Sequence, residues 1–236
     1  MPEKEVIILA GGLGTRLQGV LSGSPKCMAP VNGMPFLCYV FDYLISQKVD
    51  KAIISVGFLK EQVISYFGNS FRNLAIEYSS ENEPLGTGGA IKLALGKCVG
   101  SRVFVINGDT FFIPDLAAME QLHVQKKSDI TISVKFVPDA GRYGKVLTDE
   151  TGRITSFSEK DPLADSGWIN GGIYLLEKQV FDGNDKVKFS IENELFKVSS
   201  KIIYMQAFET DAFFLDIGIP DDYFKAQTLF KLPENR

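Results

Sequence analysis

The sequence predicts an α/β fold built on a mixed, mostly parallel sheet with helices on both faces. Along the first half of the chain, short apolar runs alternate with amphipathic segments, as strands alternate with helices in parallel sheets. Several of these runs end at glycine or at Asn-Gly-Asp, where a buried strand meets a loop. The 236 residues are 45% hydrophobic and 23% charged, which suits a folded chain that needs no metal or disulfide for stability.

The strand–helix alternation is clearest in the first half. Pro35 suits the first position of a helix, and Gly68 and Gly96 are suited to end one. Apolar residues recur at helical spacing in the amphipathic segments and form short continuous runs between them. We therefore predict strands at Glu5–Leu9, Ala52–Val56, Ala75–Tyr78 and Val103–Ile106, and helices at Pro35–Lys48, Lys60–Phe67 and Thr87–Leu95.

The second half contains more strands than helices. The segment Asp149-Glu150-Thr151-Gly152 separates two short apolar runs and is typical of a hairpin turn. No change in composition and no flexible linker divides the chain, so we expect a single domain. The predicted strands are Ile130–Phe136, Lys145–Leu147, Ile154–Phe157, Ile169–Leu176, Ile202–Ala207 and Ala212–Asp216, and the predicted helices are Asp115–Lys127, Ser190–Ser199 and Asp221–Phe230.

Charge and cysteine content narrow the classes of protein. Lysine and arginine number 25 and aspartate and glutamate 29, so the net charge is −4 and a nucleic-acid partner is disfavoured. The three cysteines, Cys27, Cys38 and Cys98, include no C-x-x-C pair, which argues against a disulfide framework or a zinc site. No run of 18 apolar residues occurs, so we expect a cytoplasmic protein without a membrane partner.

A glycine-rich loop after the first strand is the strongest chemical signal. Its sequence is Leu9-Ala10-Gly11-Gly12-Leu13-Gly14-Thr15-Arg16-Leu17. Glycines at the end of a buried strand let backbone N–H groups face phosphate oxygens, and the Arg16 guanidinium suits bidentate phosphate contact. The dinucleotide and P-loop patterns both fail, because Leu17 replaces the third glycine and no G-K-[ST] follows. An ordinary strand-to-helix turn is the alternative interpretation.

Further motifs extend along nearly the whole chain. The glycine-rich loop is followed by Pro25-Lys26 and Pro30. The later motifs are Glu83-Pro84-Leu85-Gly86-Thr87-Gly88-Gly89, Asn107-Gly108-Asp109, Tyr143-Gly144, Glu159-Lys160, Asn170-Gly171-Gly172-Ile173-Tyr174 and Phe214-Leu215-Asp216-Ile217-Gly218. In these motifs and their order the chain resembles the sugar-phosphate nucleotidyltransferase family, although Cys27-Met28 departs from the proline that often follows the lysine there.

The resemblance implies a Rossmann-like nucleotidyltransferase fold in one domain. Residues from about 1 to 115 would form a nucleotide-binding half, and residues from about 116 to 236 a sugar-binding half. The implied reaction is attack by a sugar 1-phosphate oxygen on the α-phosphorus of a nucleoside triphosphate, with release of pyrophosphate. Because the attacking phosphate is already ionised, no general base is needed, and we expect His123 to be a packing or surface residue.

The resemblance also implies roles for individual residues. Arg16 and Lys26 would be catalytic and stabilise the reacting α-phosphate and the leaving pyrophosphate. The residues implied to bind the nucleotide are Leu9, Ala10, Gly11, Gly12, Gly14, Thr15, Glu83 and Gly88, and those implied to bind the sugar phosphate are Gly144, Glu159, Lys160 and Asn170.

Two aspartates are the predicted metal ligands. Asp109 and Asp216 each follow an apolar strand. If those strands are parallel neighbours, both carboxylates lie at the carboxyl edge of the sheet, where oxygen ligands beside phosphates suit Mg²⁺. The alternative is that each aspartate is a helix cap or a turn residue.

Glu83 is the residue that bears on the nucleotide base. A carboxylate accepts hydrogen bonds from both N1–H and N2–H₂ of guanine, whereas uracil and thymine suit an amide better. Gly86, Gly88 and Gly89 would then let the base pack against bare backbone. The resemblance together with Glu83 favours GTP, and a solvated acid beside Glu81 is the alternative interpretation.

The sugar is the least determined substrate. Within the family the chain is most similar to enzymes that use D-glycero-α-D-manno-heptose 1-phosphate, and mannose 1-phosphate is the alternative. The two sugars differ at the exocyclic end, so the polar loop Asp161–Trp168 would line the extension. The resulting GDP-sugar would supply capsule or lipopolysaccharide synthesis.

Two other functions remain open on the sequence. The same reaction with UTP or dTTP is one, and a catalytically silent regulatory subunit that binds sugar nucleotides is the other. The presence of Arg16, Lys26, Asp109, Lys160 and Asp216 together speaks against the silent subunit. The sequence leaves open whether the chain forms a homo-oligomer.

Overall fold

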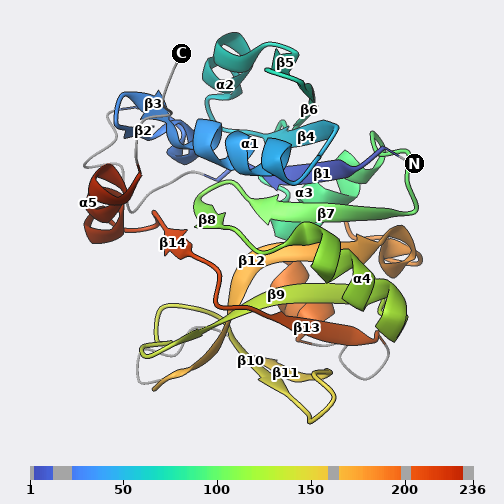
Figure 1. The fold of residues 1–236 in the computed structure, drawn as a ribbon. Helices are drawn as coiled ribbons and strands as arrows, with labels where there is room; N and C mark the ends of the chain where they lie inside the picture. Colours follow the sequence, from blue (N-terminus) through green and yellow to red (C-terminus); the bar gives the residue numbers. More distant parts are fainter. Residues whose placement is uncertain (1–2, 13–22, 159–164, 198–202, 231–236) are drawn as a thin grey trace.

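The computed structural model describes residues 3–12, 23–158, 165–197 and 203–230 (Figure 1). The α-helices are α1 (Phe36–Ser46), α2 (Lys60–Phe67), α3 (Gly86–Leu95), α4 (Leu116–Lys126) and α5 (Pro220–Leu229), with shorter turns η2 (Lys26–Met28), η3 (Lys178–Phe181) and η4 (Glu192–Phe196). The strands are β1 (Glu5–Leu9), β2 (Pro30–Val31), β3 (Met34–Pro35), β4 (Lys51–Val56), β5 (Ser70–Phe71), β6 (Leu74–Ser80), β7 (Arg102–Asn107), β8 (Thr110–Phe112), β9 (Ile130–Val137), β10 (Lys145–Thr148), β11 (Ile154–Ser158), β12 (Gly167–Glu177), β13 (Met205–Glu209) and β14 (Phe214–Asp216).

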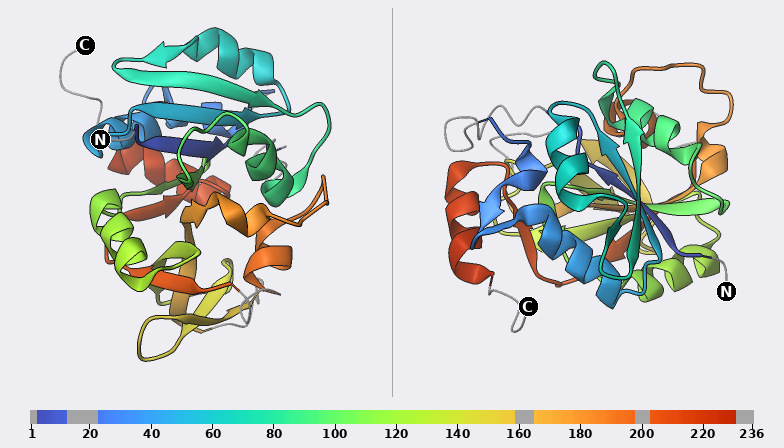
Figure 2. Two further views of the ribbon diagram at one scale, coloured as in Figure 1. Left: turned by 90° about the vertical axis from the view of Figure 1, so that its right-hand side faces the viewer. Right: turned by 90° about the horizontal axis from the view of Figure 1, so that it is seen from above.

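Ten of the described strands form one central sheet, which confirms the predicted mixed and mostly parallel α/β architecture. Its path runs β11-β10-β12-β7-β1-β4-β6-β5, and β9 pairs with β12 and with β13. Strands β6, β4, β1 and β7 are parallel, whereas β12 is antiparallel to β7. The sheet is therefore continuous from the first half of the chain into the second (Figures 1 and 2).

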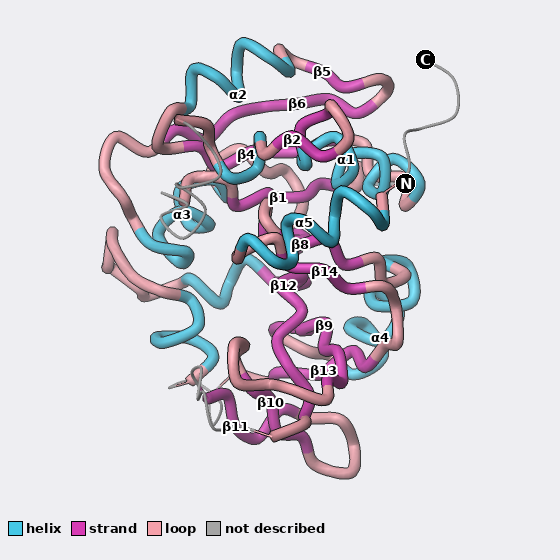
Figure 3. Tube along the Cα trace, turned by 90° about the vertical axis from the view of Figure 1, so that its left-hand side faces the viewer, coloured by secondary structure: helices cyan, strands magenta, loops and turns pink. Residues whose placement is uncertain are grey.

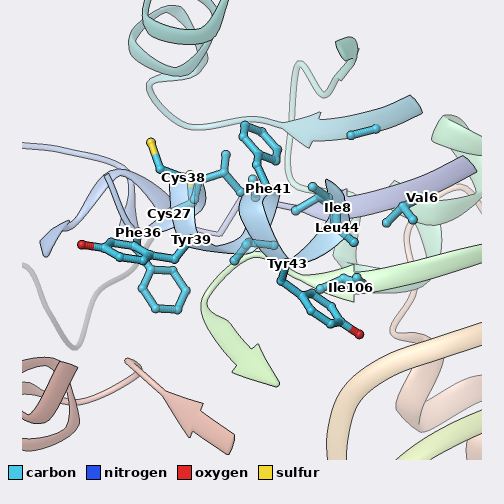
Figure 4. Packing of buried hydrophobic residues seen from close by; sticks show 14 of the residues in the cluster. Val6, Ile8, Cys27, Phe36, Cys38, Tyr39, Phe41, Tyr43, Leu44 and Ile106 are labelled. Atoms are coloured by element: carbon cyan, nitrogen blue, oxygen red, sulfur yellow. The ribbon is translucent and has the colours of Figure 1, made fainter. Parts of the chain in front are cut away.

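Both faces of the sheet are covered by apolar side chains. Val6 and Ile8 of β1 belong to one buried cluster, which also contains Phe36 and Phe41 of α1 (Figure 4). Ile7, between them in sequence, belongs to a second cluster on the other face. Because successive side chains of a strand point to opposite faces, a strand that is apolar throughout must be covered on both sides. This explains the continuous apolar runs of the first half.

Most predicted elements occur within one or two residues of their predicted bounds, and the details differ at three places near the end of the chain. Of the strand predicted at 202–207, residue 202 lies outside the described residues, and the described strand begins at Met205, after Tyr204 donates its N–H to the Asp129 carboxylate at 2.8 Å. The strand predicted at 212–216 begins at Phe214, after a turn in which Ala212 N–H donates to the Thr210 hydroxyl. The helix predicted at 190–199 contains the π-turn η4 in its described part.

A two-stranded sheet and the last helix lie beside the carboxyl end of β7. Strand β14 pairs antiparallel with β8, with Asp216 opposite Thr110, and α5 follows directly (Figure 3). Helix α5 is bound to the early part of the chain, because Tyr223 and Gln227 both donate to the Pro30 carbonyl. In the described ranges no helix has the length and apolar character needed to cross a membrane.

Candidate active site

The start of the glycine-rich loop lines a cavity of about 500 Å³, here called the glycine-loop cavity. Leu9, Gly11 and Gly12 form one side of it, and Gly86 and Thr87 at the start of α3 form another. Ala10 is buried beneath this wall, where its N–H donates to the Ser55 carbonyl at 2.9 Å. The cavity therefore has walls made largely of backbone and small residues at the carboxyl edge of the parallel strands.

A second cavity of about 260 Å³, here called the aspartate cavity, lies next to the first. Charged and amide side chains line it, including Lys26, Asp109, Asp216 and Asn170, together with Gly144. Asn107, Asp109 and Glu192 line both cavities and form their shared wall. Ligands bound in the two cavities would therefore meet at this wall.

Lys26 is placed between the two predicted metal ligands. Its ammonium group contacts Asp109 Oδ2 and lies 3.8 Å from Asp216 Oδ1. The expectation that the strands before these aspartates are parallel neighbours is wrong, because β14 pairs antiparallel with β8 instead of extending the main sheet. The two carboxylates nevertheless converge, since β8 directly follows Asp109 and brings β14 alongside.

The aspartate pair has the donor set that magnesium uses. The Asp109 and Asp216 side chains are 37% and 27% exposed, so water can complete a coordination sphere that needs few protein carboxylates. In this structure the Lys26 ammonium lies between the two carboxylates, so a positively charged group already occupies this position. The residues present therefore fit a magnesium ion.

A bulge in β12 directs Asn170 into the aspartate cavity. The pairing of β12 with β9 shifts register between Asn170 and Tyr174, and Gly172 has a φ of +76°, which favours glycine. Asn170 accepts the Gly172 N–H at 2.9 Å and donates to the Tyr174 hydroxyl at 2.8 Å. Burial raises the pKa of Tyr174 above its ordinary value, so this phenol stays protonated under the cavity floor.

The structure places Glu81 and Glu83, two residues apart in sequence, in different surroundings. Glu81 lines the glycine-loop cavity, accepts the Leu85 N–H at 2.8 Å and lies 3.3 Å from the Ser55 hydroxyl. Glu83 is exposed and lines neither cavity. Of these two acids, it is therefore Glu81 that lies in the cavity wall, and the sequence reasoning missed it because β6 ends at Ser80 and the chain then turns.

The glycines of the Gly86–Gly89 segment pack against the segment 187–189, and of these glycines only Gly86 lines a cavity. A Cβ atom at Gly88 would lie 2.2 Å from the Phe189 ring, and the Gly88 N–H donates to the Phe189 carbonyl. Gly88 lines neither cavity, so the structure does not bring it to the proposed nucleotide site. The bare backbone of Gly88 and Gly89 instead lets Phe189 and Val187 lie directly on the start of α3.

Thr87 and Glu192 extend this contact and were not predicted. The Thr87 hydroxyl donates to Glu192 Oε2 at 2.6 Å and accepts the Ile191 N–H at 3.0 Å. The Ser190 hydroxyl also donates to Glu192 Oε2 at 2.6 Å. A pair separated by 105 residues leaves no local pattern in the sequence, so no signal could have revealed it.

Several predicted residues lie outside the described part of the chain. These are Gly14, Thr15, Arg16, Glu159 and Lys160, together with residues 161–164 of the loop predicted to line the sugar extension. The loop predicted at 161–168 ends before Gly167, because Gly167 and Trp168 belong to β12, where Trp168 packs edge-on against Phe136. His123 is confirmed as a packing residue, since it is buried and its ring nitrogen lies 2.7 Å from the Thr131 hydroxyl.

Comparison with known proteins gives close and nearly full-length relatives. The chain is 45% identical to the D-glycero-alpha-D-manno-heptose 1-phosphate guanylyltransferase of Aneurinibacillus thermoaerophilus, over 94% of this chain and 96% of the relative. It is 44% identical to the enzyme of the same name from Campylobacter jejuni, over 93% of this chain and 97% of that one. The mannose-1-phosphate guanylyltransferase of Mycobacterium tuberculosis is 32% identical over 93% of this chain and 62% of that protein.

Comparison of the fold with solved structures identifies the same group of proteins. The crystal structure of HddC from Yersinia pseudotuberculosis is 38% identical and matches with a TM-score of 0.88, covering 97% of this chain and 100% of that one. The HddC complex with GMP-PN matches with a TM-score of 0.86. The sequence profile of the nucleotidyl transferase family matches residues 5–231, which include both cavities and the strands that position them. The chain therefore belongs to the nucleotidyl transferase family.

Proposed function

We propose that the chain transfers GMP from GTP to D-glycero-α-D-manno-heptose 1-phosphate, releasing pyrophosphate and forming a GDP-heptose. The observation that carries this proposal is the 44–45% identity, over nearly the whole chain, to two enzymes named for this reaction. Identity to the mannose-1-phosphate guanylyltransferases is lower, at 31–33%. Mannose 1-phosphate is therefore the second candidate substrate.

The two cavities fit the two substrates of such a reaction. The glycine-loop cavity would take the nucleotide, whose phosphates would lie along the backbone of the glycine-rich loop. The aspartate cavity would take the sugar 1-phosphate, with Asn170 and the Gly144 backbone contacting it. The attacking oxygen and the α-phosphorus would meet at the shared wall, so catalysis would consist mainly of positioning and charge neutralisation.

Cationic side chains and a bound metal ion would neutralise the charge of the phosphates. Lys26 would contact the reacting phosphates, and Arg16 and Lys160 would add charge to the nucleotide and sugar phosphates respectively. Asp109 and Asp216 would hold a magnesium ion, which when bound would offset the charge of phosphate oxygens. The Lys26 ammonium, which touches both carboxylates, would then turn towards the phosphates.

The guanine argument applies to Glu81, because Glu81 and not Glu83 lies in the wall of the glycine-loop cavity. Its Oε2 accepts the Leu85 N–H, which leaves acceptor capacity for guanine N1–H and N2–H₂. A glutamine at this position would both donate and accept and would suit a pyrimidine better. Glu83, two residues further along and exposed, provides the matched control.

The test is a pyrophosphate-release assay with GTP, ATP, UTP and dTTP, crossed with heptose, mannose and glucose 1-phosphates. We expect GTP with the heptose phosphate to give the highest kcat/KM. Glu81→Gln should narrow the preference for GTP over UTP by about tenfold or more, because a hydrogen bond to a charged group is lost, whereas Glu83→Gln should not. Wild-type preference for a pyrimidine triphosphate would overturn the guanine assignment, and preference for mannose 1-phosphate would overturn the sugar alone.

A further inference from the structure

Arg142 connects the loop before β10 to the last helix. Its Nη2 donates to the Tyr143 hydroxyl at 2.7 Å and to Asp222 Oδ2 at 2.6 Å. Asp222 lies in the first turn of α5, and its side chain is only 7% exposed. A buried carboxylate is retained in a fold when it is paired, and Arg142 and Lys225 pair with this one from two sides.

Tyr143 also forms part of the aspartate cavity. Its ring packs edge-on against Phe214 at a centroid distance of 5.6 Å, and both residues line that cavity. Phe214 begins β14, which ends at Asp216, and α5 starts four residues later. The contact from Asp222 through Arg142 to Tyr143 therefore joins α5 to the cavity on the side of the predicted metal ligand Asp216.

The contact with Arg142 determines the direction of the Tyr143 proton. A guanidinium has only donors, so the Tyr143 oxygen must accept from Arg142 and cannot donate to it. The single phenol proton therefore points away from Arg142. In a cavity lined by Lys26 and by the carboxylates of Asp109, Glu192 and Asp216, a ligand that approaches this proton must supply an acceptor oxygen.

We propose that Arg142, held by the buried Asp222, is a positioning residue that fixes the Tyr143 hydroxyl as a hydrogen-bond donor to a phosphate oxygen of the sugar 1-phosphate. Asp222 acts through Arg142 and does not touch the substrate. The inference rests on the proposed function in one respect, which is that the aspartate cavity takes the sugar 1-phosphate. It assigns to α5 a part in substrate recognition.

The experiment is a double-mutant cycle on Tyr143→Phe and Asp222→Asn. KM for the sugar 1-phosphate, KM for GTP, kcat and the thermal midpoint are measured for both single variants and the double variant. Tyr143→Phe keeps the ring on Phe214 and the Arg142–Asp222 pair, so it tests the hydroxyl in a folded protein. Asp221→Asn is the matched control, since Asp221 is the exposed neighbour of Asp222 in the same helical turn.

Each single variant should raise KM for the sugar 1-phosphate by about tenfold, as expected when a hydrogen bond to a charged group is lost. KM for GTP should stay within twofold, and the double variant should be no worse than Tyr143→Phe alone, because both changes remove one interaction. Asp221→Asn should behave as the wild type.

Three results would overturn the inference. These are an unchanged sugar-phosphate KM in Tyr143→Phe, single effects that multiply in the double variant, and equal rises in both KM values. A wild type that turns over no sugar 1-phosphate would instead refute the proposed function, and this inference with it. Those failures are distinguishable, because the first three require an active wild type.

Discussion

The two cavities share one wall but differ in the residues that line the rest of them. Much of the glycine-loop cavity is bounded by backbone and small residues such as Gly11, Gly12 and Gly86, and its charged side chains are all carboxylates. The aspartate cavity is bounded by side chains that contact one another, as Lys26 does Asp109 and Asp216. The backbone part of such a wall selects by shape, because any added side chain occupies ligand space, and Glu81 adds hydrogen-bond acceptors to it. A cavity walled by charged groups selects by electrostatics, and its variants should alter chemistry more than shape.

The largest expected effect lies in the charged cavity. Asp109→Asn should lower kcat by roughly a hundredfold or more, because an amide neither offsets the Lys26 charge nor binds magnesium as a carboxylate does. The urea unfolding midpoint should change little, since Asp109 is partly exposed. Asp211→Asn, which removes a 96% exposed acid paired with Lys135, is the control. Near-normal turnover of Asp109→Asn at saturating magnesium would remove this residue from the site.

A smaller effect should distinguish packing glycines from cavity glycines. Gly88→Ala places a methyl group 2.2 Å from the Phe189 ring and should lower the free energy of unfolding by about 1–3 kcal/mol. Gly12→Ala places its methyl group where no described atom lies within 4 Å, so it should raise KM for GTP with little loss of stability. Urea denaturation and steady-state kinetics on both variants make the comparison. Equal stability of the two variants would contradict the packing role of Gly88.

The smallest expected effect concerns a buried polar group remote from both cavities. Burial lowers the pKa of His123 below its ordinary value, although Glu177 at 3.4 Å opposes this shift. The unfolded chain therefore binds the proton more readily, so this contribution to stability is fully present above about pH 6.5 and declines as pH falls below it. Urea unfolding at pH 7.5 and 5.5 should show a steeper loss for the wild type than for His123→Gln. Parallel losses in the two proteins would argue against the lowered pKa.

The parts of the fold that could be predicted are those with a local cause. Helix α2 spans the predicted residues Lys60–Phe67, since apolar spacing and a following glycine define it locally. Strand β8 was missed because three residues are too few to show a period. The antiparallel pairing of β14 was missed because register between distant segments has no local signal.

In the site, too, the residues in local sequence motifs were predicted, whereas contacts between distant segments were not. Lys26, Asp109, Asp216, Asn170 and the start of the glycine-rich loop were predicted because each belongs to a contiguous motif, and the structure places them along the two cavities. The sequence reasoning chose Glu83 and not Glu81 as the base-binding acid. In a strand, alternate side chains face opposite sides of the sheet, but β6 ends at Ser80, so this alternation does not show which of the two acids faces the cavity. Gly88 was assigned to the nucleotide because nothing near it in sequence indicates that Phe189 packs on it.

By itself, the sequence determined the α/β class, the order of most strands and helices, and the motifs that place the chain among nucleotidyl transferases. Only the tertiary structure decided that Thr87 reaches Glu192 and that Arg142 reaches Asp222. These pairs are separated by 105 and 80 residues. The physical reason is that periodicity, capping and turn chemistry act over a few residues, whereas such contacts exist only once the sheet has closed and brought remote segments together.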